Sequence, residues 1–459
     1  MPRTFDAIVI GSGQAGPFLA VRLAKAGHRT AFIEREHLGG TCVNDGCIPT
    51  KTLVASARVA HMARRAGAYG VMLGGPVSVD AKAVKARKDA VVRASIEGLT
   101  RWLESTVNLE MIRGEASFAS PREVRINGEA LTAPRIFINT GGRPTIPDWP
   151  GIESIPYLTN TSMMALDVVP EHLIVVGGSY IGLEFVQMYR RFGSKVTVLE
   201  HADHLIVRED SDVRDAVRGM LEGEGIDVRV TVRDIAVAPH GRGVALTASA
   251  KGEPISLTAS HLLIAVGRKP NVEALNLAAA GIVSDARGFI QVDDELRTST
   301  PGIWAMGDVN GRGAFTHTSY NDFEIVAANV LDGQPRRLSD RITAYALFTD
   351  PPLGRVGMTE TEVRASGRPA LKGFMPMTRV GRARERGETQ GFMKVLVDAE
   401  TKLILGAALF CIEGDEIVHS LLDAMYAGAP YTTIQHAMHI HPTVSELIPT
   451  LLADLKPLT

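Results

Sequence analysis

The chain has 459 residues, 45% of them hydrophobic, and a formal net charge of -2 at pH 7. This length exceeds a single hydrophobic core and predicts about two to four domains, while the near-neutral charge argues against wholesale binding to nucleic acid or membrane surfaces. No apolar stretch approaches the roughly 18 residues of a membrane helix. Because a strand-like run begins at Asp6, we expect no signal peptide. Three cysteines in so long a chain predict a reducing cytoplasm rather than a secreted disulfide framework.

Residues 6–34 read as a strand, a glycine-rich turn, a helix and a second strand. The turn carries Gly11, Gly13 and Gly16 in the spacing G-x-G-x-x-G, and Glu34 ends the second strand. These glycines suit a tight turn, close backbone approach to a pyrophosphate and close packing of helix on strand. The phosphate would lie at the helix N-terminus, and Glu34 would accept hydrogen bonds from ribose hydroxyls. The segment predicts a dinucleotide site, with an ordinary glycine-rich turn as the alternative.

Residues 39–51 read GGTCVNDGCIPTK and hold two of the three cysteines, Cys42 and Cys47. On an ideal helix, residues five apart lie about 140° apart, so a disulfide would not close there without distortion. Residues 44–46 are strong turn formers, which places Cys42 in a bend. Pro49 suits the first turn of a helix, so Cys47 lies just ahead of a helix N-terminus, where the dipole favours a thiolate. The pattern favours a reversible redox disulfide.

Two alternatives to a redox pair stay open. A metal site needs further ligands at a usual spacing, and only His37 is nearby. The second alternative is that Cys42 and Cys47 have no chemical role. Cys411 is distant in sequence and has no predicted role. Beyond the pair we expect a charged helix over 82–104, strands over 109–140 and a proline-rich linker over 143–151.

Near residue 173 the first unit recurs, with Gly177, Gly178 and Gly182 in the turn and Ser179 in place of the middle glycine. Serine is small, so close approach of a phosphate remains possible. This internal duplication predicts a second dinucleotide site, and the alternative is a second unit kept only for folding. The turn-rich segment 267–271 closes the unit.

Glu200 ends the second strand of this repeat. A carboxylate there repels a 2′-phosphate and accepts from a free 2′-hydroxyl, which favours NADH over NADPH. Arg208, a few residues on, keeps NADPH open as an alternative. Two dinucleotide sites imply two dinucleotides, and the economical pairing is a tightly held flavin with an exchangeable nicotinamide.

From about residue 341 two strand-like runs, 393–397 and 403–410, precede helical runs at 416–427 and 444–455. We interpret this part as a separate α+β domain. The basic run 379–386 is expected as a solvated loop, with steering of an anionic substrate as the alternative.

The tail contains His436, His439 and His441, followed by Pro442. Because Pro442 breaks the helical register, the histidines are not expected to share a face. His441 with Glu446 fits a base and its orienting carboxylate. A metal site and a solvated helix start are the alternatives.

In this order the motifs resemble the pyridine nucleotide–disulfide oxidoreductases with a CxxxxC active site, such as dihydrolipoamide dehydrogenase, glutathione reductase and mercuric reductase. The resemblance covers essentially the whole chain. It implies an α/β fold with two Rossmann-like dinucleotide-binding domains and a C-terminal α+β dimerisation domain. The implied divisions are an FAD-binding domain at 1–150, an NAD(P)-binding domain at 151–270, a central domain at 271–340 that completes the FAD site, and a dimerisation domain at 341–459.

The resemblance also implies residue roles. Cys42 would be the interchange thiol that meets the substrate, and Cys47 the flavin-side thiol that forms a charge-transfer complex. His441 and Glu446 of one subunit would serve the cysteine pair of the other in a homodimer. Further cofactor-binding positions are Thr41, Lys51, Gly114, Thr140, Gly141 and Asp308 for FAD, and Tyr180 (an aromatic gate over the flavin), Glu184 (beside the nicotinamide) and Gly267 for the nicotinamide nucleotide. No resident metal is expected.

The implied activity passes electrons from NADH through FAD to the Cys42–Cys47 disulfide and on to a small disulfide, dithiol or lipoyl substrate. The alternative is a mercuric-reductase-like reduction of Hg(II) or Cu(II), or of a quinone. Thr50, where lipoamide dehydrogenases usually have Ser, slightly favours that branch. His441 and a tail without cysteines favour a disulfide substrate. The non-enzymatic alternative is a redox-sensing flavoprotein.

Overall fold

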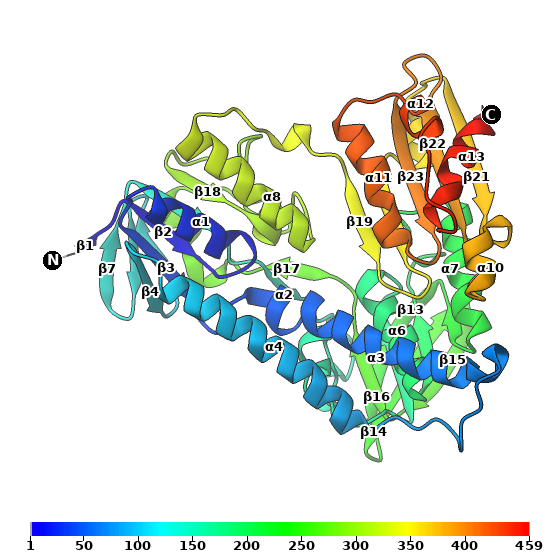
Figure 1. Ribbon diagram of the computed structural model, residues 1–459. Helices are drawn as coiled ribbons and strands as arrows, with labels where there is room; N and C mark the ends of the chain where they lie inside the picture. The colour runs from blue at the N-terminus through cyan, green and yellow to red at the C-terminus, as the bar shows by residue number, and fades with distance from the viewer. Residues whose placement is uncertain (1, 459) are drawn as a thin grey trace.

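The computed structural model describes residues 2–458, in which two parallel β-sheets and one six-stranded antiparallel sheet each form the centre of a layered unit (Figure 1). This arrangement confirms the predicted α/β class, with two Rossmann-like units and a C-terminal α+β unit. Within residues 2–458, no helix has both the length and the apolar composition that a membrane crossing requires.

The first parallel sheet contains the N-terminal strand and strands that return later in the chain. Along the central strand, Ala7 and Val9 belong to one hydrophobic core, and Ile8 and Ile10 to another, because successive side chains of a strand point to opposite faces. Burial on both faces explains why the strand is apolar throughout. Across the sheet the strands are β18 (Ile303–Ala305), β8 (Arg135–Ile138), β2 (Ala7–Ile10), β3 (Thr30–Glu34) and β4 (Leu109–Arg113).

Helices cover one face of this sheet, and a small mixed sheet, in which only β1 and β7 are parallel, covers the other. The helices are α1 (Ala15–Lys25), α4 (Ala81–Glu104) and α8 (Thr316–Ala327), which continues into η6 (Ala328–Asp332). Across the small sheet the strands are β1 (Arg3–Thr4), β7 (Glu129–Thr132), β6 (Glu123–Ile126) and β5 (Ser117–Ser120). The short helices in later segments of the chain are η3 (Glu273–Leu275), η4 (Leu277–Ala280), η5 (Gly307–Asn310) and η7 (Leu338–Asp340).

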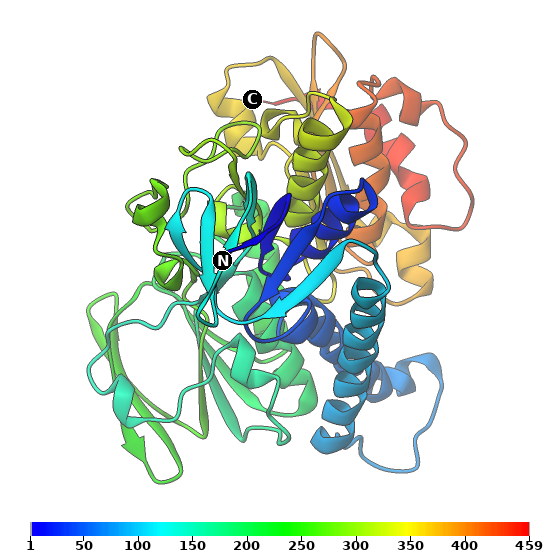
Figure 2. The ribbon, with the colours of Figure 1, turned by 90° about the vertical axis from the view of Figure 1, so that its left-hand side faces the viewer.

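The second parallel sheet repeats the first. Leu173 and Val175 belong to one core, and Ile174 and Val176 to another. Across the sheet the strands are β12 (Asp227–Arg229), β11 (Lys195–Leu199), β10 (His172–Val176) and β16 (His261–Ile264). One face packs on α6 (Tyr180–Phe192) and α7 (Ser211–Gly223). The other packs on a meander, at the lower left of Figure 2, of β13 (Val232–His240), β14 (Gly243–Ala250) and β15 (Glu253–Ala259). The short helices before this sheet are η2 (Ile152–Ser154) and α5 (Asn160–Met163).

The cysteine pair lies on two consecutive helices, α2 (Gly40–Asn44) and α3 (Cys47–Arg65), which is followed by η1 (Ala66–Tyr69). On α3, Leu53 and Ala57 enter a hydrophobic core that also contains Phe192 of the second unit and Phe410 of the C-terminal sheet. Packing against two other parts of the molecule therefore fixes the helix that begins at Cys47.

The C-terminal sheet is antiparallel throughout. Its strands in order are β19 (Ala344–Leu347), β20 (Leu353–Gly357), β23 (Ile404–Phe410), β22 (Phe392–Asp398), β21 (Ala370–Pro376) and β24 (Lys456–Pro457). Its helices are α9 (Glu360–Ala365), α11 (Gly414–Tyr426), α12 (Thr432–Gln435), η9 (Ser445–Leu447) and α13 (Ile448–Ala453). The predicted strands 393–397 and 403–410 are thus confirmed as β22 and β23.

Two expectations about connecting segments need correction. The first two residues of the predicted linker 143–151 belong to β9 (Gly142–Pro144), which pairs with β17 (Arg268–Pro270), whereas residues 145–151 have no helix or strand. The basic run 379–386 is not a plain loop, because it ends η8 (Met377–Arg379) and contains α10 (Gly381–Glu385). Nearby acidic side chains balance its charges, as where Arg386 Nη1 lies 2.8 Å from Glu413 Oε1.

Candidate active site

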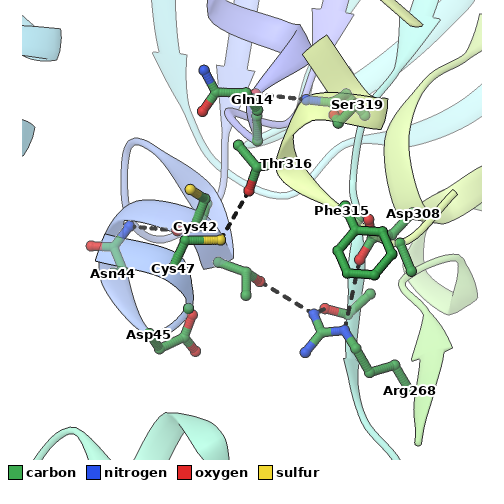
Figure 3. A pocket seen from close by; sticks show the side chains of 18 of the residues that line it. Gln14, Cys42, Asn44, Asp45, Cys47, Arg268, Asp308, Phe315, Thr316 and Ser319 are labelled. Carbon is green, nitrogen blue, oxygen red and sulfur yellow. Dashed lines mark hydrogen bonds and ion pairs between the residues drawn. The ribbon is translucent and has the colours of Figure 1, made fainter. Parts of the chain in front are cut away.

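A cavity of about 1370 Å³ lies between the first glycine loop, the cysteine helices, the β9–β17 pair and the start of α8. Pockets for drug-sized ligands measure roughly 300–1,000 Å³, so this cavity has room for a dinucleotide. Figure 3 shows Cys42 and Cys47 on one side of it, with Arg268, Asp308 and Phe315 on the other.

The first glycine loop lines this cavity and is tied to the end of β3. The backbone N–H and the hydroxyl of Ser12 both donate to Glu34 Oε2, over 2.9 and 2.5 Å, and the N–H of Glu36 donates to Oε1 over 2.8 Å. Gly11 has φ +99°, and a Cβ there would lie 2.4 Å from the carbonyl oxygen of Asn139. Gly13 and Glu34 line the same cavity, whereas Gly16 is buried behind the loop. The loop therefore presents backbone donors at the N-terminus of α1, as an anion site requires.

The thiols of Cys42 and Cys47 differ in acidity. The Cys42 thiol donates to the Cys47 sulfur, which lowers the pKa of Cys47 to about 6, and the Thr316 hydroxyl and the charge of Lys51 act in the same direction. Cys47 Sγ lies 3.0 Å from Thr316 Oγ1. The same hydrogen bond to Cys47, together with burial, raises the pKa of Cys42. Both side chains are half-buried and unbridged, so the reduced pair holds its negative charge on Cys47 at neutral pH.

The local backbone differs from the sequence expectation for Cys42. It lies within the short helix α2 instead of a bend, and the chain turns only at Asp45 and Gly46. The Asn44 amide donates to the carbonyls of Leu38 and Gly40, both over 2.9 Å, which stabilises this helix. Cys47 is the first residue of α3, where the dipole favours its thiolate.

Lys51 and Glu184 form an ion pair across the cavity wall. Lys51 Nζ donates to Glu184 Oε2 over 2.5 Å, and the other carboxylate oxygen accepts from the N–H of Phe348 over 3.2 Å. The ammonium also lies 4.4 Å from the centre of the Phe348 ring. The structure therefore joins two predicted cofactor residues that lie far apart in sequence, one from α3 and one from α6.

Asp308 lies across the cavity from the cysteines, and burial raises the pKa of its carboxyl group. Its Oδ2 atom is 3.7 Å from Arg268 Nε, beyond hydrogen-bond length. Arg268 also donates to Gly142 O and, over 3.4 Å, to Thr41 Oγ1. The predicted residues Gly114, Thr140 and Gly141 line the same cavity.

Sequence reasoning missed Arg268 and Thr316 as site residues. Arg268 directly follows Gly267, so the turn-rich segment 267–271 could have identified it as a site residue. Thr316 comes from the start of α8, 269 positions after Cys47, and no motif marks it.

The second glycine loop repeats the two backbone hydrogen bonds of the first. The N–H of Gly178 donates to Glu200 Oε2 over 2.6 Å, and the N–H of Ala202 donates to Oε1 over 2.7 Å. Gly177 has φ +117° and Gly267 has φ +136°. Of residues 177–182, only Tyr180 and Ile181 line the large cavity within the described chain.

His441 and Glu446 form a pair at the surface of the C-terminal part. His441 Nδ1 lies 2.7 Å from Glu446 Oε2, and the imidazole is 79% exposed whereas the carboxylate is 12% exposed. Neither residue lines the cavity that contains Cys42 and Cys47 in the described chain. The structure thus brings the dyad together but does not bring it to the cysteines of its own subunit.

Cys411 lies in the core of the C-terminal part, where burial raises the pKa of its thiol. Residues 2–458 contain no cluster of three or more histidine, cysteine or acidic side chains with the geometry of a metal site.

Family comparisons agree with this geometry. The model of the family described as "Pyridine nucleotide-disulphide oxidoreductase" matches residues 5–322, and that of its dimerisation domain matches residues 343–452. Curated relatives include the probable pyridine nucleotide-disulfide oxidoreductase RclA of Escherichia coli, 36% identical over 98% of this chain and 99% of that one. A dihydrolipoyl dehydrogenase of Thermus scotoductus is 34% identical, with 97% and 96% covered. A mercuric reductase of Bacillus cereus is 31% identical, with 96% and 70% covered.

The solved structure titled "HOCl-induced flavoprotein disulfide reductase RclA from Escherichia coli" superposes with a TM-score of 0.90, at 36% identity, covering 98% of this chain and 100% of the other. A Cu(II) complex of that protein also superposes with a TM-score of 0.90, at 36% identity and with 99% of both chains covered.

Proposed function

Because the chain belongs to the pyridine nucleotide-disulphide oxidoreductase family, whose members use FAD and NAD(P)H, we propose that it is an NADH-dependent flavoprotein that reduces a small disulfide through Cys42 and Cys47. The observation that carries this proposal is the asymmetric thiol pair in the wall of a dinucleotide-sized cavity, with a pKa of about 6 at Cys47 and a raised pKa at Cys42.

The cavity fits FAD by its size and by the groups around it. The loop of Gly11, Gly13 and Gly16 would hold the pyrophosphate, and Glu34 the adenosine ribose. The Asp308 carboxylate, 3.7 Å from Arg268, keeps acceptor capacity for hydroxyl groups of a ligand. The remaining proposed contacts are Thr41, Lys51, Gly114, Thr140 and Gly141. When bound, FAD would take up the electron pair of the reduced nicotinamide and make it available to the cysteine disulfide.

Cys47 is proposed as the flavin-side thiol and Cys42 as the thiol that meets substrate. At neutral pH Cys47 is the thiolate, stabilised by the Thr316 hydroxyl and the Lys51 ammonium. Cys42, with its raised pKa, keeps its proton until a base removes it. Thiolate formation at Cys42 then permits attack on a substrate disulfide, giving a mixed disulfide that Cys47 resolves.

His441 and Glu446 of the partner subunit are proposed as that base and its orienting carboxylate. The imidazole is exposed and held at Nδ1 by Glu446 over 2.7 Å, which leaves Nε2 free to exchange a proton with Cys42 or the leaving thiol. This role requires a homodimer, and the match of residues 343–452 to a dimerisation domain supports one.

The second glycine loop is proposed as the site of the nicotinamide nucleotide, with Gly177, Gly182 and Gly267 shaping it. Glu200 accepts two backbone N–H groups at the end of its strand, and a carboxylate there favours a free 2′-hydroxyl and hence NADH. Tyr180 is proposed as the gate between this site and the flavin, and Glu184 as the carboxylate beside the nicotinamide.

We propose the domain limits 1–150, 151–270, 271–340 and 341–459 for the FAD, NAD, central and dimerisation domains. We also propose a cytoplasmic location, because three cysteines in a chain of 459 residues do not form the disulfide framework of a secreted protein.

Anaerobic stopped-flow reduction tests the function. The FAD-loaded protein is mixed with NADH or NADPH and then with lipoamide, glutathione disulfide, Hg(II) or Cu(II). Reduction by NADH in preference to NADPH, followed by fast reoxidation by one disulfide, is the expected result. No reduction by either nucleotide would refute the proposed function.

Reduction of a metal ion or quinone is the second candidate. Two comparisons favour this candidate: the similarity to a mercuric reductase of Bacillus cereus and the similarity to the Cu(II) complex of RclA from Escherichia coli. Reoxidation by Hg(II), Cu(II) or a quinone alone would support this candidate and would leave the His441–Glu446 pair without a role.

A further inference from the structure

A buried polar network joins the second glycine loop to the C-terminal sheet. The Glu209 side chain is fully buried, at 0% exposure. Its Oε1 atom accepts hydrogen bonds from the hydroxyls of Tyr180, over 3.0 Å, and Tyr345, over 2.6 Å. Both tyrosines line the large cavity. One carboxylate oxygen therefore holds two aromatic rings that come from different units of the molecule.

Arg355 of β20 supplies the compensating charge without directed hydrogen bonds. Its Nε lies 3.8 Å from Glu209 Oε2, and its Nη2 lies 3.9 Å from Asp210 Oδ2, with the side chain at 0% exposure. Within the described chain, neither Glu209 Oε2 nor any guanidinium nitrogen of Arg355 has a hydrogen-bond partner. Buried polar groups of native proteins nearly always have one, so these uncommitted groups need an explanation.

Tyr180 lies where movement of its ring would leave Glu209 without one of its hydrogen-bond donors. It is the first residue of α6, and its ring meets Phe315 and Tyr345 edge-on, with ring centres 6.1 and 5.5 Å apart. If Tyr180 covers the cavity as proposed above, the ring has to move before a nicotinamide can enter. That movement breaks its hydrogen bond to Glu209.

On the basis of the proposed function, we propose that Glu209 latches Tyr180 over the cavity and that Arg355 is the partner to which Glu209 turns when Tyr180 leaves. A shift of less than 1 Å along the 3.8 Å separation would bring the carboxylate into hydrogen-bond range of the guanidinium. The new charge-assisted hydrogen bond offsets the loss of the tyrosine hydroxyl. Glu209 and Arg355 are thus positioning residues, which act on the nicotinamide through Tyr180.

The test compares two routes of reduction in the FAD-loaded protein. NADH has to pass Tyr180, whereas dihydrolipoamide reduces the protein through Cys42 and does not. Tyr180→Phe keeps the ring but removes the latch, so the second-order rate constant for reduction by NADH is expected to rise roughly tenfold, as for the loss of one hydrogen bond to a charged group. Reduction by dihydrolipoamide is expected to stay at the wild-type rate. Tyr189→Phe, on the same helix, is the matched control and leaves both rates unchanged.

Arg355→Met is expected to have the opposite effect and to slow reduction by NADH by roughly tenfold, because Glu209 then has no second partner. If Arg355→Met does not fold, Arg355→Lys is tested instead. This variant keeps the buried charge but loses the guanidinium fork, so it is expected to slow reduction by NADH less than Arg355→Met would. Glu209→Leu, which removes the acceptor of the Tyr180 hydroxyl, should match Tyr180→Phe, and the double variant should be no faster than either single variant.

The outcomes separate the latch from the function on which it rests. Wild-type protein that NADH does not reduce would refute the proposed function. Wild-type protein that NADH reduces, together with a Tyr180→Phe variant of unchanged or lower rate, would overturn the latch alone. Equal changes on the NADH and dihydrolipoamide routes would also overturn it, since they would indicate general damage to the fold.

Discussion

Ser12 and Gly178 occupy equivalent places in the two glycine loops, and each donates its backbone N–H to the carboxylate that ends the next strand. The distances are 2.9 Å to Glu34 and 2.6 Å to Glu200. The first glycine of each loop is also equivalent: a Cβ would lie 2.4 Å from a carbonyl oxygen at Gly11 and 2.3 Å from one at Gly177. The two units have kept the same backbone cradle.

The surroundings of the two loops differ. The first loop opens onto the cavity of about 1370 Å³. At the second loop, a Cβ on Gly178 would lie 2.5 Å from Cδ2 of Leu205, and Tyr180 is tied down by Glu209. Because the two loops share this backbone, we propose that the residues packed in front of each loop determine whether its dinucleotide is enclosed or exchanges with solvent.

Equivalent alanine substitutions at Gly11 and Gly177 should give the largest difference in effect between the two sites. Both glycines have positive φ, +99° and +117°, so both substitutions add similar backbone strain. Gly11→Ala is expected to give protein without flavin and without turnover. Gly177→Ala is expected to retain flavin that dithiols reduce and NADH does not. Flavin absorbance and anaerobic reduction measure both outcomes, and loss of flavin from Gly177→Ala would show that the sites are not independent.

Serine substitutions of the two cysteines test the contents of the first site. Cys42→Ser is expected to abolish disulfide turnover while keeping reduction of the flavin by NADH and a long-wavelength charge-transfer band from the Cys47 thiolate. Cys47→Ser should lack the band. A band in Cys47→Ser instead would reverse the proposed roles.

The same band should depend on pH in the two-electron-reduced protein. Because the pKa of Cys47 is lowered to about 6, the thiolate and its band are present above that pH and are lost as the pH falls through it. The hydrogen bond from Cys42 is the largest cause of the lowering, so the midpoint should lie at higher pH in Cys42→Ala, which removes the donor. An absorbance titration of both proteins measures the shift, and equal midpoints would contradict the hydrogen-bond account.

Glu200→Ala probes the second site. Removing the carboxylate should raise the preference for NADPH relative to NADH by roughly tenfold, the effect of about one hydrogen bond or charge contact. The ratio of kcat/KM values measures it. Glu34→Ala is the matched control, since it should weaken flavin retention without changing that ratio; a change in Glu34→Ala of similar size would remove the distinction between the loops.

Thr316→Val is expected to have the smallest effect. The loss of one neutral hydrogen bond to the Cys47 sulfur should raise its pKa by up to about one unit, so the charge-transfer band should disappear at a higher pH than in the wild type. Thr316→Ser keeps the hydroxyl and should titrate like the wild type. Identical curves for the Val and Ser variants would show that the 3.0 Å contact does not stabilise the thiolate.

The parts of the fold and site that sequence predicted are those encoded locally. The strand–turn–helix units, with Gly11 to Glu34 in the first and Gly177 to Glu200 in the second, have spacing rules that follow from backbone geometry. The turn at Asp45 and Gly46 and the helix after it likewise follow from residues within a few positions. The fold class was therefore accessible before the structure.

Contacts between distant segments were not accessible in the same way. Thr316 reaches Cys47 from 269 positions away, and Glu209 meets Tyr345 across 136 positions. The helix of Cys42 also escaped prediction, because Thr41, Val43 and Asn44 have weak helix propensity and α2 depends on the hydrogen bonds of Asn44 to neighbouring carbonyls. In each case tertiary contacts determine the local structure or the position of the side chain, and these contacts cannot be predicted from a single sequence.

Because Cys411 is buried, the number of thiols that react in the folded protein reports the redox state of Cys42 and Cys47. Its side chain has 0% exposure, whereas Cys42 and Cys47 are half-buried at the cavity wall. A thiol-specific reagent should therefore label two groups in the folded, reduced protein and none in the folded, oxidised protein. After denaturation the stoichiometry should rise by one in both states, which makes a simple alkylation assay report the disulfide independently of any bound chromophore.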